Sequence, residues 1–318
     1  MPDDHSLLVA LCTHNPNRGF LAETIDALAR QTMAKEAWEF LLVDNASTTT
    51  TARDADISWH PRARCISEPK PGLTAARSRV IREAVTTGAK TILFVDDDNI
   101  LAPDFLERGL ALGRENPRLG CWGGQLIPRF EEEPPEWFKA FKKYLALFDL
   151  EEDIVSEAFK GNHDILPAGA GMFLKTELAT RYIESMALHP LRRLLGVNGK
   201  DPMRGEDTDI GLFALAEGWQ VARFRDLILT HITPSVRITM DYVARVLEGA
   251  ACSDVLLRSI HGEPLPKRDG WITRLRRYWQ ARRLPDPHGR FYAAECRGRH
   301  RGFSILTREG VHSFRLKI

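Results

Sequence analysis

Three consecutive carboxylates are the residues of this sequence best suited to chemistry. Asp96, Asp97 and Asp98 follow the apolar run Ile92–Val95, which is typical of a buried strand. Like charges at the end of a buried strand repel one another, and a divalent cation that links them to a phosphate would relieve the repulsion. The alternative is a solvated acidic turn that caps the helix expected after Pro103. Taken alone, the run favours neither interpretation.

A second acidic group follows Gly205 and comprises Glu206, Asp207 and Asp209. A carboxylate within hydrogen-bond reach of an alcohol can take up the proton of that alcohol, so this group could supply a general base. Acidic residues are also favoured in the first turn of a helix by the helix dipole. Without further context, the helix-dipole interpretation is preferred.

The elements that must position the first acidic group alternate along the chain. Strands are expected at residues 7–12, 40–43, 63–66 and 91–96, and helices at residues 20–32, 72–87 and from residue 103. Such alternation predicts a mainly parallel sheet with helices on both faces. Because ligands bind beyond the carboxyl ends of such strands, we expect Thr13, Asp44 and Asp96 at one edge.

The pattern changes after residue 120. Further strands are expected at residues 121–127, 166–174 and 219–232, and helices at residues 176–186, from residue 206 to Gly218, 238–260 and 271–283. Residues 130–165, rich in Glu, Pro and aromatic side chains, are typical of a lid or binding loop. We expect one domain over residues 1–235, divided by this change of pattern into residues 1–118 and 119–235. A basic, mainly helical extension would follow over residues 236–318.

Charge is distributed unevenly between these parts. Residues 262–318 contain 14 Lys and Arg against 5 Asp and Glu, a net +9, whereas the rest of the chain has 30 against 38, a net −8. The five scattered cysteines form no CxxC pair, which favours reduced thiols in the cytoplasm. The first residues lack the basic and apolar regions of a secretory signal, and no apolar run approaches the ~20 residues of a membrane span.

Five short segments connect the two acidic groups to a known pattern by their order and spacing within residues 6–232. They are Leu11-Cys12-Thr13-His14-Asn15, Val43-Asp44-Asn45-Ala46-Ser47, Pro71-Gly72-Leu73-Thr74-Ala75-Ala76-Arg77-Ser78, Val95-Asp96-Asp97-Asp98 and Gly205-Glu206-Asp207-Thr208-Asp209. With these segments the chain resembles the family 2 glycosyltransferases, inverting enzymes that use nucleotide-sugar donors. The resemblance implies a GT-A-like, Rossmann-type mixed sheet flanked by helices. It also implies a catalytic domain over residues 1–235, with a nucleotide-binding half (1–118) and an acceptor-binding half (119–235).

The resemblance also implies a donor site. Thr13, Asp44, Arg77 and Asp96 would hold the nucleotide sugar, with Asp44 accepting a hydrogen bond from N3–H of uracil or thymine and Asp96 bonding the ribose. Thr13 could instead cap a turn, Asp44 could form an Asx-turn, and Arg77 could lie on the surface. Two family positions differ, because Ser78 stands where Asn is common and Val80 where Gly is common.

A metal site for Mg²⁺ or Mn²⁺ is implied at the acidic motif. Alternate residues of a strand point the same way, so Asp96 and Asp98 could converge while Asp97 points away. By resemblance Asp98 would ligate the metal, and His231 is a further ligand in some relatives. A lone histidine is more often structural, and that alternative stays open.

Catalysis and acceptor binding are implied for the second half of the chain. Asp207 would be the base, with Glu206 orienting the acceptor and raising the pKa of Asp207. Small side chains at Gly169, Ala170 and Gly171 would let a sugar approach the backbone, although a strand bulge explains them equally well.

Two more residues are candidate acceptor contacts. Trp137 could stack on a sugar ring or anchor local packing. Asp209 could bind the acceptor or act only through the helix dipole.

The basic extension admits two interpretations. Residues 271–283 combine tryptophans with arginines, which suits an interfacial helix on an anionic membrane. An ordinary solvated basic face is the alternative. No recognised nucleic-acid-binding module is present, so no nucleic-acid partner is expected.

The sequence therefore predicts an inverting hexosyltransferase of polysaccharide or glycoconjugate synthesis. It would move a sugar from a nucleotide diphosphate, as in a UDP-sugar, to a carbohydrate or lipid-linked carbohydrate, in the cytoplasm or on the inner face of the membrane. The alternatives are a sugar-phosphate nucleotidyltransferase and a non-catalytic nucleotide-sugar binding module. A nucleotidyltransferase normally has a Gly-rich, basic N-terminal loop, which residues 11–19 do not form.

Overall fold

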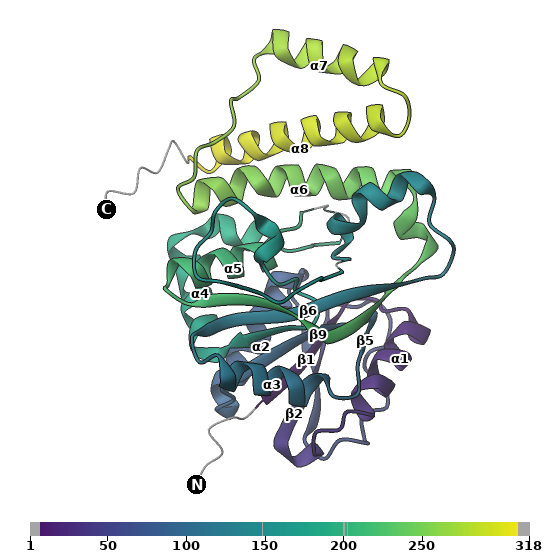
Figure 1. Cartoon of the computed structure of the whole chain (residues 1–318), viewed down its shortest axis with the longest axis vertical. Coiled ribbons are helices and arrows are strands. Elements are labelled where there is room, and N and C mark those ends of the chain that lie inside the picture. Colours follow the sequence, from purple (N-terminus) through teal and green to yellow (C-terminus); the bar gives the residue numbers. More distant parts are fainter. Residues whose placement is uncertain (1–6, 148, 200, 202, 311–318) are drawn as a thin grey trace.

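A single mixed sheet with helices packed around it forms the body of the molecule (Figure 1). The computed structural model describes residues 7–147, 149–199, 201 and 203–310. The first five residues, from which we expect no secretory signal, lie outside these ranges.

The sheet has nine strands in the order β3-β2-β1-β4-β8-β6-β9-β5, with β7 paired to β9. The strands are β1 (Leu7–Thr13), β2 (Trp38–Asn45), β3 (Ala63–Glu68), β4 (Thr91–Asp96), β5 (Asn99–Leu101), β6 (Leu119–Phe130), β7 (Ile154–Ser156), β8 (Met172–Lys175) and β9 (Gln220–Thr233). Strands β1 to β4 pair in parallel, whereas β8 is antiparallel to both β4 and β6. This arrangement confirms the predicted mixed α/β class.

Helices cover both faces of the sheet. They are α1 (Arg18–Ala29), α2 (Leu73–Thr87), α3 (Phe105–Glu115), α4 (Thr176–Leu188), α5 (Glu206–Ala216), α6 (Met240–Ile260), α7 (Trp271–Arg283) and α8 (His288–Arg308), with 3₁₀ turns η1 (Lys35–Ala37), η2 (Glu136–Leu145), η3 (His163–Ile165), η4 (Pro190–Leu194) and η5 (Ser235–Ile238). Alternate residues of β1 divide between two cores, because Leu8 and Ala10 face α2, α4 and α6 while Leu7, Val9 and Leu11 face α1 and α3. Burial on both sides explains why β1 is apolar throughout.

Asn45, the last residue of β2, holds the loops at the carboxyl edge of the sheet. The Asn45 amide donates to the carbonyls of Glu68 and Lys70, and its oxygen accepts from the Gly72 backbone N–H at 2.8 Å. Asn45 thereby ties the end of β2 to the start of α2. Gly72 has φ +115°, a conformation that L side chains rarely adopt.

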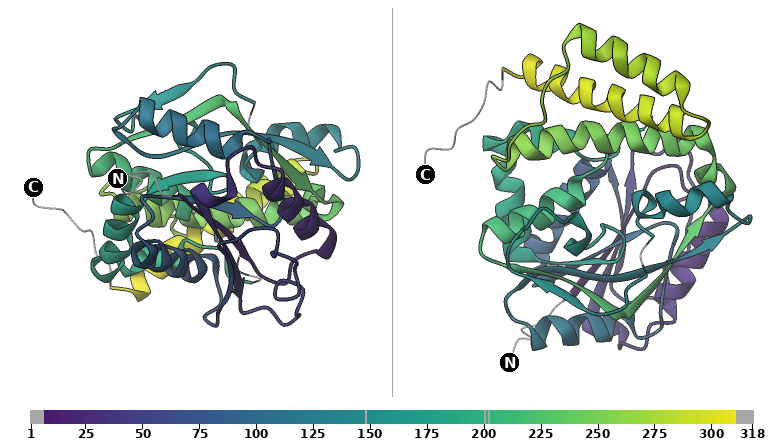
Figure 2. Two further views of the ribbon diagram at one scale, coloured as in Figure 1. Left: turned by 90° about the horizontal axis from the view of Figure 1, so that it is seen from below. Right: turned by 45° about the horizontal axis from the view of Figure 1, so that its top comes forward.

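The C-terminal helices are stacked outward from the body. Figures 1 and 2 show α8 lying along α6, with α7 outermost. Glycines allow the close approach of α8, because a Cβ at Gly298 would lie 2.0 Å from the Glu248 carbonyl and one at Gly302 would lie 2.7 Å from the Val255 Cβ. The helix predicted at residues 271–283 is confirmed, whereas α8 was not predicted. Within the described ranges, none of the helices combines the length and hydropathy needed to cross a bilayer.

Candidate active site

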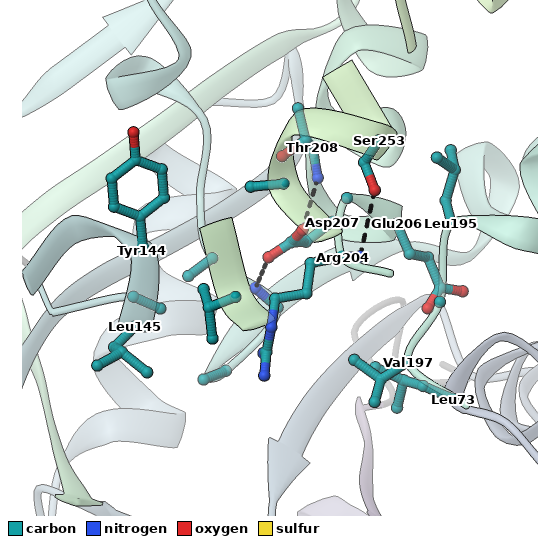
Figure 3. A pocket seen from close by; sticks show the side chains of 18 of the residues that line it. Leu73, Tyr144, Leu145, Leu195, Val197, Arg204, Glu206, Asp207, Thr208 and Ser253 are labelled. Atoms are coloured by element: carbon teal, nitrogen blue, oxygen red, sulfur yellow. Dashed lines mark hydrogen bonds between the residues drawn. The ribbon is translucent and has the colours of Figure 1, made fainter. Parts of the chain in front are cut away.

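One pocket of about 970 Å³ collects most of the predicted site residues. Its walls come from the ends of β1 and β4, the loop before β8, the start of α5 and the inner faces of α6 and α8. Asp98 and Asp207, which are more than 100 residues apart in the chain, both line it. The two acidic groups of the sequence therefore share one pocket, part of which is shown in Figure 3.

Parallel strand pairing accounts for the first wall. Thr13 of β1 is in register with Asp44 of β2, and Cys12 is in register with Asp96 of β4. The carboxyl ends of these strands consequently meet at one edge. Thr13 and Asp96 line the pocket, whereas Asp44 is buried just behind it.

The Asp44 carboxylate is engaged in local contacts. It accepts from the Ser47 backbone N–H at 3.3 Å and lies 3.2 Å from the Arg53 guanidinium. The Ser47 contact is the Asx-type turn that the sequence left open. Among these residues only Arg53 is exposed. The long, positively charged side chain of Arg53 therefore covers the Asp44 carboxylate from the solvent side.

Asp97 does not point away from Asp96 and Asp98 as strand alternation had predicted. Strand β4 ends at Asp96, and residues 97 and 98 form a turn before β5. The period-two rule therefore stops at Asp96, and all three carboxylates line the pocket. The Thr13 hydroxyl donates a hydrogen bond to Asp97. Burial and the neighbouring Asp98 raise the pKa of Asp97 to about 7, although the Thr13 hydrogen bond opposes the rise.

Asp98 and His231 come together through strand pairing. Asn99 of β5 is in register with His231 of β9, and the Ile232 N–H donates to the Asp98 carbonyl at 2.9 Å. The His231 Nε2 consequently lies 3.4 Å from the Asp98 carboxylate. The Arg237 guanidinium lies 2.8 Å from the same carboxylate and 3.1 Å from His231 Nε2.

These charges fix the protonation state of Asp98. Burial alone would raise the pKa of Asp98, but the charges and hydrogen bonds of His231 and Arg237 lower it to about 2. Asp98 is therefore an anion at neutral pH.

A divalent cation fits this pair of side chains. No group of three or more His, Cys, Asp or Glu side chains in the described ranges could hold a metal by itself. Mg²⁺ and Mn²⁺ are commonly held by one or two protein ligands together with substrate phosphates and water, and an ionised carboxylate beside an imidazole suits them. The Arg237 guanidinium, which contacts both side chains, is the cation that a metal would have to displace.

Arg77 connects the two walls of the pocket. Its buried guanidinium lies 3.9 Å from Asp96 and 3.7 Å from Glu206, and it stacks over the Phe94 ring. Although burial would lower the pKa of Arg77, the two carboxylates raise it. A Cβ at Gly169 would lie 2.4 Å from this guanidinium, so a residue without a side chain is required there.

Asp207 stands at the start of α5 with its carboxylate held by backbone donors. Its Oδ2 accepts from the Gly169 N–H at 3.1 Å, and its Oδ1 accepts from the Thr208 N–H at 2.9 Å (Figure 3). The side chain is only half-buried and lines the pocket. Each carboxylate oxygen keeps acceptor capacity for a further donor.

Glu206, beside Asp207, is fully buried and titrates near neutrality. Burial raises the pKa of Glu206 to about 7, with Arg77 opposing the rise and Asp207 adding to it. The sequence predicted that this pair would raise the pKa of Asp207. That statement about Asp207 stays a prediction, and the raised pKa of Glu206 reflects its burial.

Asp209 has a different role from the expected acceptor contact. Its carboxylate is 0% exposed and accepts from the Tyr182 hydroxyl at 2.8 Å, Arg192 at 2.7 Å and the His261 ring at 2.7 Å. Residues two apart on a helix point in different directions, so Asp209 faces the core while Asp207 faces the pocket. We therefore correct the acceptor assignment of Asp209 to a structural one.

Trp137, a predicted acceptor contact, lies outside the pocket. It packs against Phe138, Phe141 and Phe291 of α8, and is not part of the pocket wall. This is the packing alternative that the sequence left open. The aromatic residue of the same segment that does line the pocket is Tyr144.

Of the three small residues predicted to contact the acceptor, two line the pocket and the third does not. Gly169 and Ala170 line the pocket, but Gly171 is turned into the core with φ +70°, and its N–H donates to the Phe94 carbonyl. A Cβ on Gly171 would lie 2.7 Å from Leu229. Gly171 is therefore needed for packing against the sheet.

Tyr144 and Arg237 are among the pocket residues that escaped sequence reasoning. Tyr144 was one of several aromatic residues between positions 130 and 165, and nothing in their spacing distinguished it. Arg237 lies six residues after His231, beyond the end of β9. Arg237 could have been identified because it is a basic residue just past β9, the strand that carries the candidate metal ligand His231.

Comparisons with known proteins identify the family of this chain. Residues 8–173, just over half of the chain, match the family described as Glycosyl transferase family 2. A search of curated protein sequences found no match.

Solved structures share the fold at low sequence identity. TarS 1–349 of S. aureus is 13% identical with a TM-score of 0.52, covering 96% of this chain and 92% of that chain, and the same figures hold for its complex with UDP-GlcNAc. The mannosyltransferase PcManGT of Pyrobaculum calidifontis, in complex with GDP-Man and Mn²⁺, is 16% identical with a TM-score of 0.50, covering 96% and 75%. The fold is thus GT-A-like, and the chain belongs to glycosyl transferase family 2.

Proposed function

We propose that this glycosyltransferase moves a hexose from a nucleotide-diphosphate sugar to a hydroxyl group of a carbohydrate or lipid-linked carbohydrate, with inversion at the anomeric carbon. The observation that carries the proposal is the shared pocket of Asp98 and Asp207. A transfer of this kind needs an anion-neutralising group at the leaving diphosphate and a base at the attacking alcohol. The two acidic groups supply sites for both.

Asp207 is the proposed base. The acceptor hydroxyl attacks the anomeric carbon as the bond from that carbon to the diphosphate oxygen breaks, and the hydroxyl proton passes to the Asp207 carboxylate. The N–H groups of Gly169 and Thr208 fix the orientation of this carboxylate while its remaining lone pairs face the pocket. A fixed base reduces the reorganisation needed in the transition state.

The donor would lie along the strand ends. We propose that Thr13, Asp44, Arg77 and Asp96 hold the nucleotide and that Asp98 and His231 hold Mg²⁺ or Mn²⁺. When bound, the ion would neutralise charge on the departing diphosphate. The Mn²⁺ in the PcManGT complex supports this assignment.

The identity of the base in the donor is proposed as uracil. The TarS complexes with UDP and UDP-GlcNAc support a uridine nucleotide, whereas the PcManGT complex contains GDP-Man. Asp44 would face N3–H of uracil only if Arg53 moved off its carboxylate. A panel of nucleotide sugars separates the two donors.

Acceptor binding is assigned to the opposite wall. Gly169, Ala170 and Tyr144 line this part of the pocket and offer backbone and one aromatic face to a sugar ring. We propose that the acceptor belongs to a polysaccharide or glycoconjugate. The free thiols of all five cysteines support a cytoplasmic setting.

The test is a donor panel with and without Mn²⁺, using wild type and Asp207→Asn. We expect wild type to bind and turn over one donor, and Asp207→Asn to bind that donor normally while transfer falls by about 10²–10⁴-fold. Near-normal transfer by Asp207→Asn would refute the assignment of the base. Binding without turnover by wild type, across donors and acceptors, would favour a non-catalytic binding module, and pyrophosphate release from a nucleoside triphosphate would favour a nucleotidyltransferase.

A further inference from the structure

Helix α7 presents apolar side chains to solvent. Trp271, Ile272, Leu275, Tyr278 and Trp279 are between 51% and 75% exposed. At 3.6 residues per turn these five side chains fall within an arc of roughly 120°. We call this the outer arc of α7. An apolar arc is expected to face a core, and here it faces away from the protein.

The opposite side of the helix holds it to α8. Ala281 is the buried residue of α7, and its carbonyl lies within 2.4 Å of where a Cβ on Gly289 would be. Arg277 is close to Cys296 of α8 and pairs with Asp269 at 3.0 Å. The direction of Arg277 and Ala281 is roughly 140° from the centre of the outer arc. The outer arc is therefore free of α8, as the outermost position of α7 in Figures 1 and 2 suggests.

Arginines border the outer arc. Helix α7 contains no acidic residue, and Arg274, Arg276, Arg282 and Arg283 are all exposed. Arg274, Arg276 and Arg283 lie on either side of the arc, whereas Arg282 falls within it, one turn after Tyr278, to which it is hydrogen-bonded. Basic residues around an aromatic, apolar stripe are complementary to an anionic bilayer surface, which attracts arginine and where Trp side chains prefer the headgroup level.

We propose that α7 lies in the plane of an anionic lipid bilayer, with Trp271, Ile272, Leu275 and Trp279 inserted below the headgroups. Arg274, Arg276 and Arg283 beside the arc, and Arg282 in its last turn, contact lipid phosphates. A second copy of the chain is a poorer occupant, because pairing α7 with itself would bring like charges together. Nucleic acid would satisfy the arginines but leave Ile272 and Leu275 exposed to water.

This binding surface goes beyond the transfer reaction and does not depend on it. It does bear on the acceptor, because Pro266, which precedes α7, and Glu295 and Arg299 of α8 line the same pocket as Asp207. The residues just before α7 and the helix that packs against it thus form part of the pocket wall.

The experiment is co-sedimentation of the full chain with vesicles of phosphatidylcholine alone or mixed with phosphatidylglycerol. We expect binding only to the mixed vesicles, weakening as salt is raised. The double variant Trp271→Ala/Trp279→Ala should bind roughly tenfold to a hundredfold less tightly. Arg274→Gln/Arg276→Gln should also weaken binding.

Matched controls separate lipid insertion from general effects. Leu188→Ala removes a side chain that is 79% exposed on α4 and should leave binding unchanged. Circular dichroism and melting temperature should be unaltered in every variant, because the substituted side chains are exposed. Unchanged vesicle binding by the tryptophan variant would overturn the proposal. So would a Trp271- and Trp279-dependent dimer in sedimentation velocity without vesicle binding, or a shift with single-stranded RNA in its place.

Discussion

At the scale of single residues, the buried guanidinium of Arg77 is the point where the two walls of the pocket meet. It neutralises Asp96 at the end of β4 and Glu206 at the start of α5, at 3.9 and 3.7 Å. Removing one partner from a buried charge cluster leaves another charge uncompensated, which is costly. Arg77 is therefore as much a structural requirement of the site as a candidate donor ligand.

Glu206→Gln is predicted to change how stability depends on pH. The pKa of Glu206 is near 4.5 when unfolded and about 7 when folded, so the folded state binds more protons between these values. Its contribution to stability is present below pH 4.5 and is lost as the pH rises through 7. Wild type should lose about 1–3 kcal/mol of unfolding free energy across this range from this group, and Glu206→Gln should not.

Denaturant unfolding at several pH values measures this difference. The matched control is Glu184→Gln, which removes an exposed carboxylate on α4 and should retain the wild-type slope. Parallel profiles for wild type and Glu206→Gln would show that Glu206 is ionised in the folded protein at acidic pH.

Arg237→Gln is predicted to tighten binding of Mn²⁺ to the protein without donor. The guanidinium contacts both Asp98 and His231, so it competes with any cation for the same side chains. We expect the dissociation constant to fall about tenfold, read by titration calorimetry or by the free Mn²⁺ signal in electron paramagnetic resonance. Arg245→Gln, an exposed arginine on α6, is the control. Equal or weaker binding by Arg237→Gln would exclude competition.

The sequence predicted the position of a site residue correctly where that position follows from the direction of a strand. Thr13, Asp96 and Asp98 could be placed on one edge, because parallel strands carry their carboxyl ends together. The directions of Asp97 and Asp209 could not be predicted, because they depend on where β4 ends and on which side of α5 meets Tyr182 and Arg192. The pocket assignment of Arg237 required the fold of the segment after β9.

At the scale of elements, Asp209 holds four segments together. From α5 it contacts Tyr182 of α4, Arg192 of η4 and His261 at the end of α6. A carboxylate with three donors is well compensated although it is fully buried. The position of α5, and with it the position of Asp207, depends on this group.

Asp209→Ala is accordingly predicted to reduce the unfolding free energy by about 3–5 kcal/mol, because Arg192 would lose its buried partner. Chemical denaturation measures the change, and Asp226→Ala, at an exposed position on β9, should cost less than ~0.5 kcal/mol. A small effect at Asp209 would mean that Arg192 and His261 find other partners or water.

Sequence reasoning found the elements whose periodicity is strong and missed those defined by contacts. Strands β1, β2 and β4 are apolar runs, and Gly88 ends α2 in a left-handed conformation as its position indicated. Helix α8 was missed because its arginines and glycines mask the apolar stripe, and the glycines are required only by the close approach of α6. Strand β5 has three residues and exists through its pairing with β9.

At the scale of the whole molecule, the C-terminal extension is not separate from the catalytic body. Cys252, Val255 and Leu256 of α6 belong to the same apolar cluster as Leu8 and Ala10 of β1. The boundary near residue 235 therefore stays a prediction about function, while in packing the two parts share a core. The charge difference predicted for residues 262–318 corresponds to the α7–α8 hairpin.

Gly302→Val is predicted to push this hairpin away from α6. The added side chain would overlap Val255, and overpacking of this kind costs about 1–3 kcal/mol. Limited proteolysis should cut the connection between α6 and α7 faster, and the melting temperature should fall. Ser304→Val, on the exposed side of the same helix, should change neither. Unaltered proteolysis of Gly302→Val would indicate that α8 shifts to accommodate the valine.

The outward stacking of α6, α8 and α7 separates the outermost helix from the pocket. Among the described residues that line the pocket, none belongs to α7. Substitutions along its outward side could redirect the protein to another cellular surface while the reacting groups kept their positions. If α7 binds lipid as proposed, the residues that set the location of the enzyme are separate from those that line its pocket.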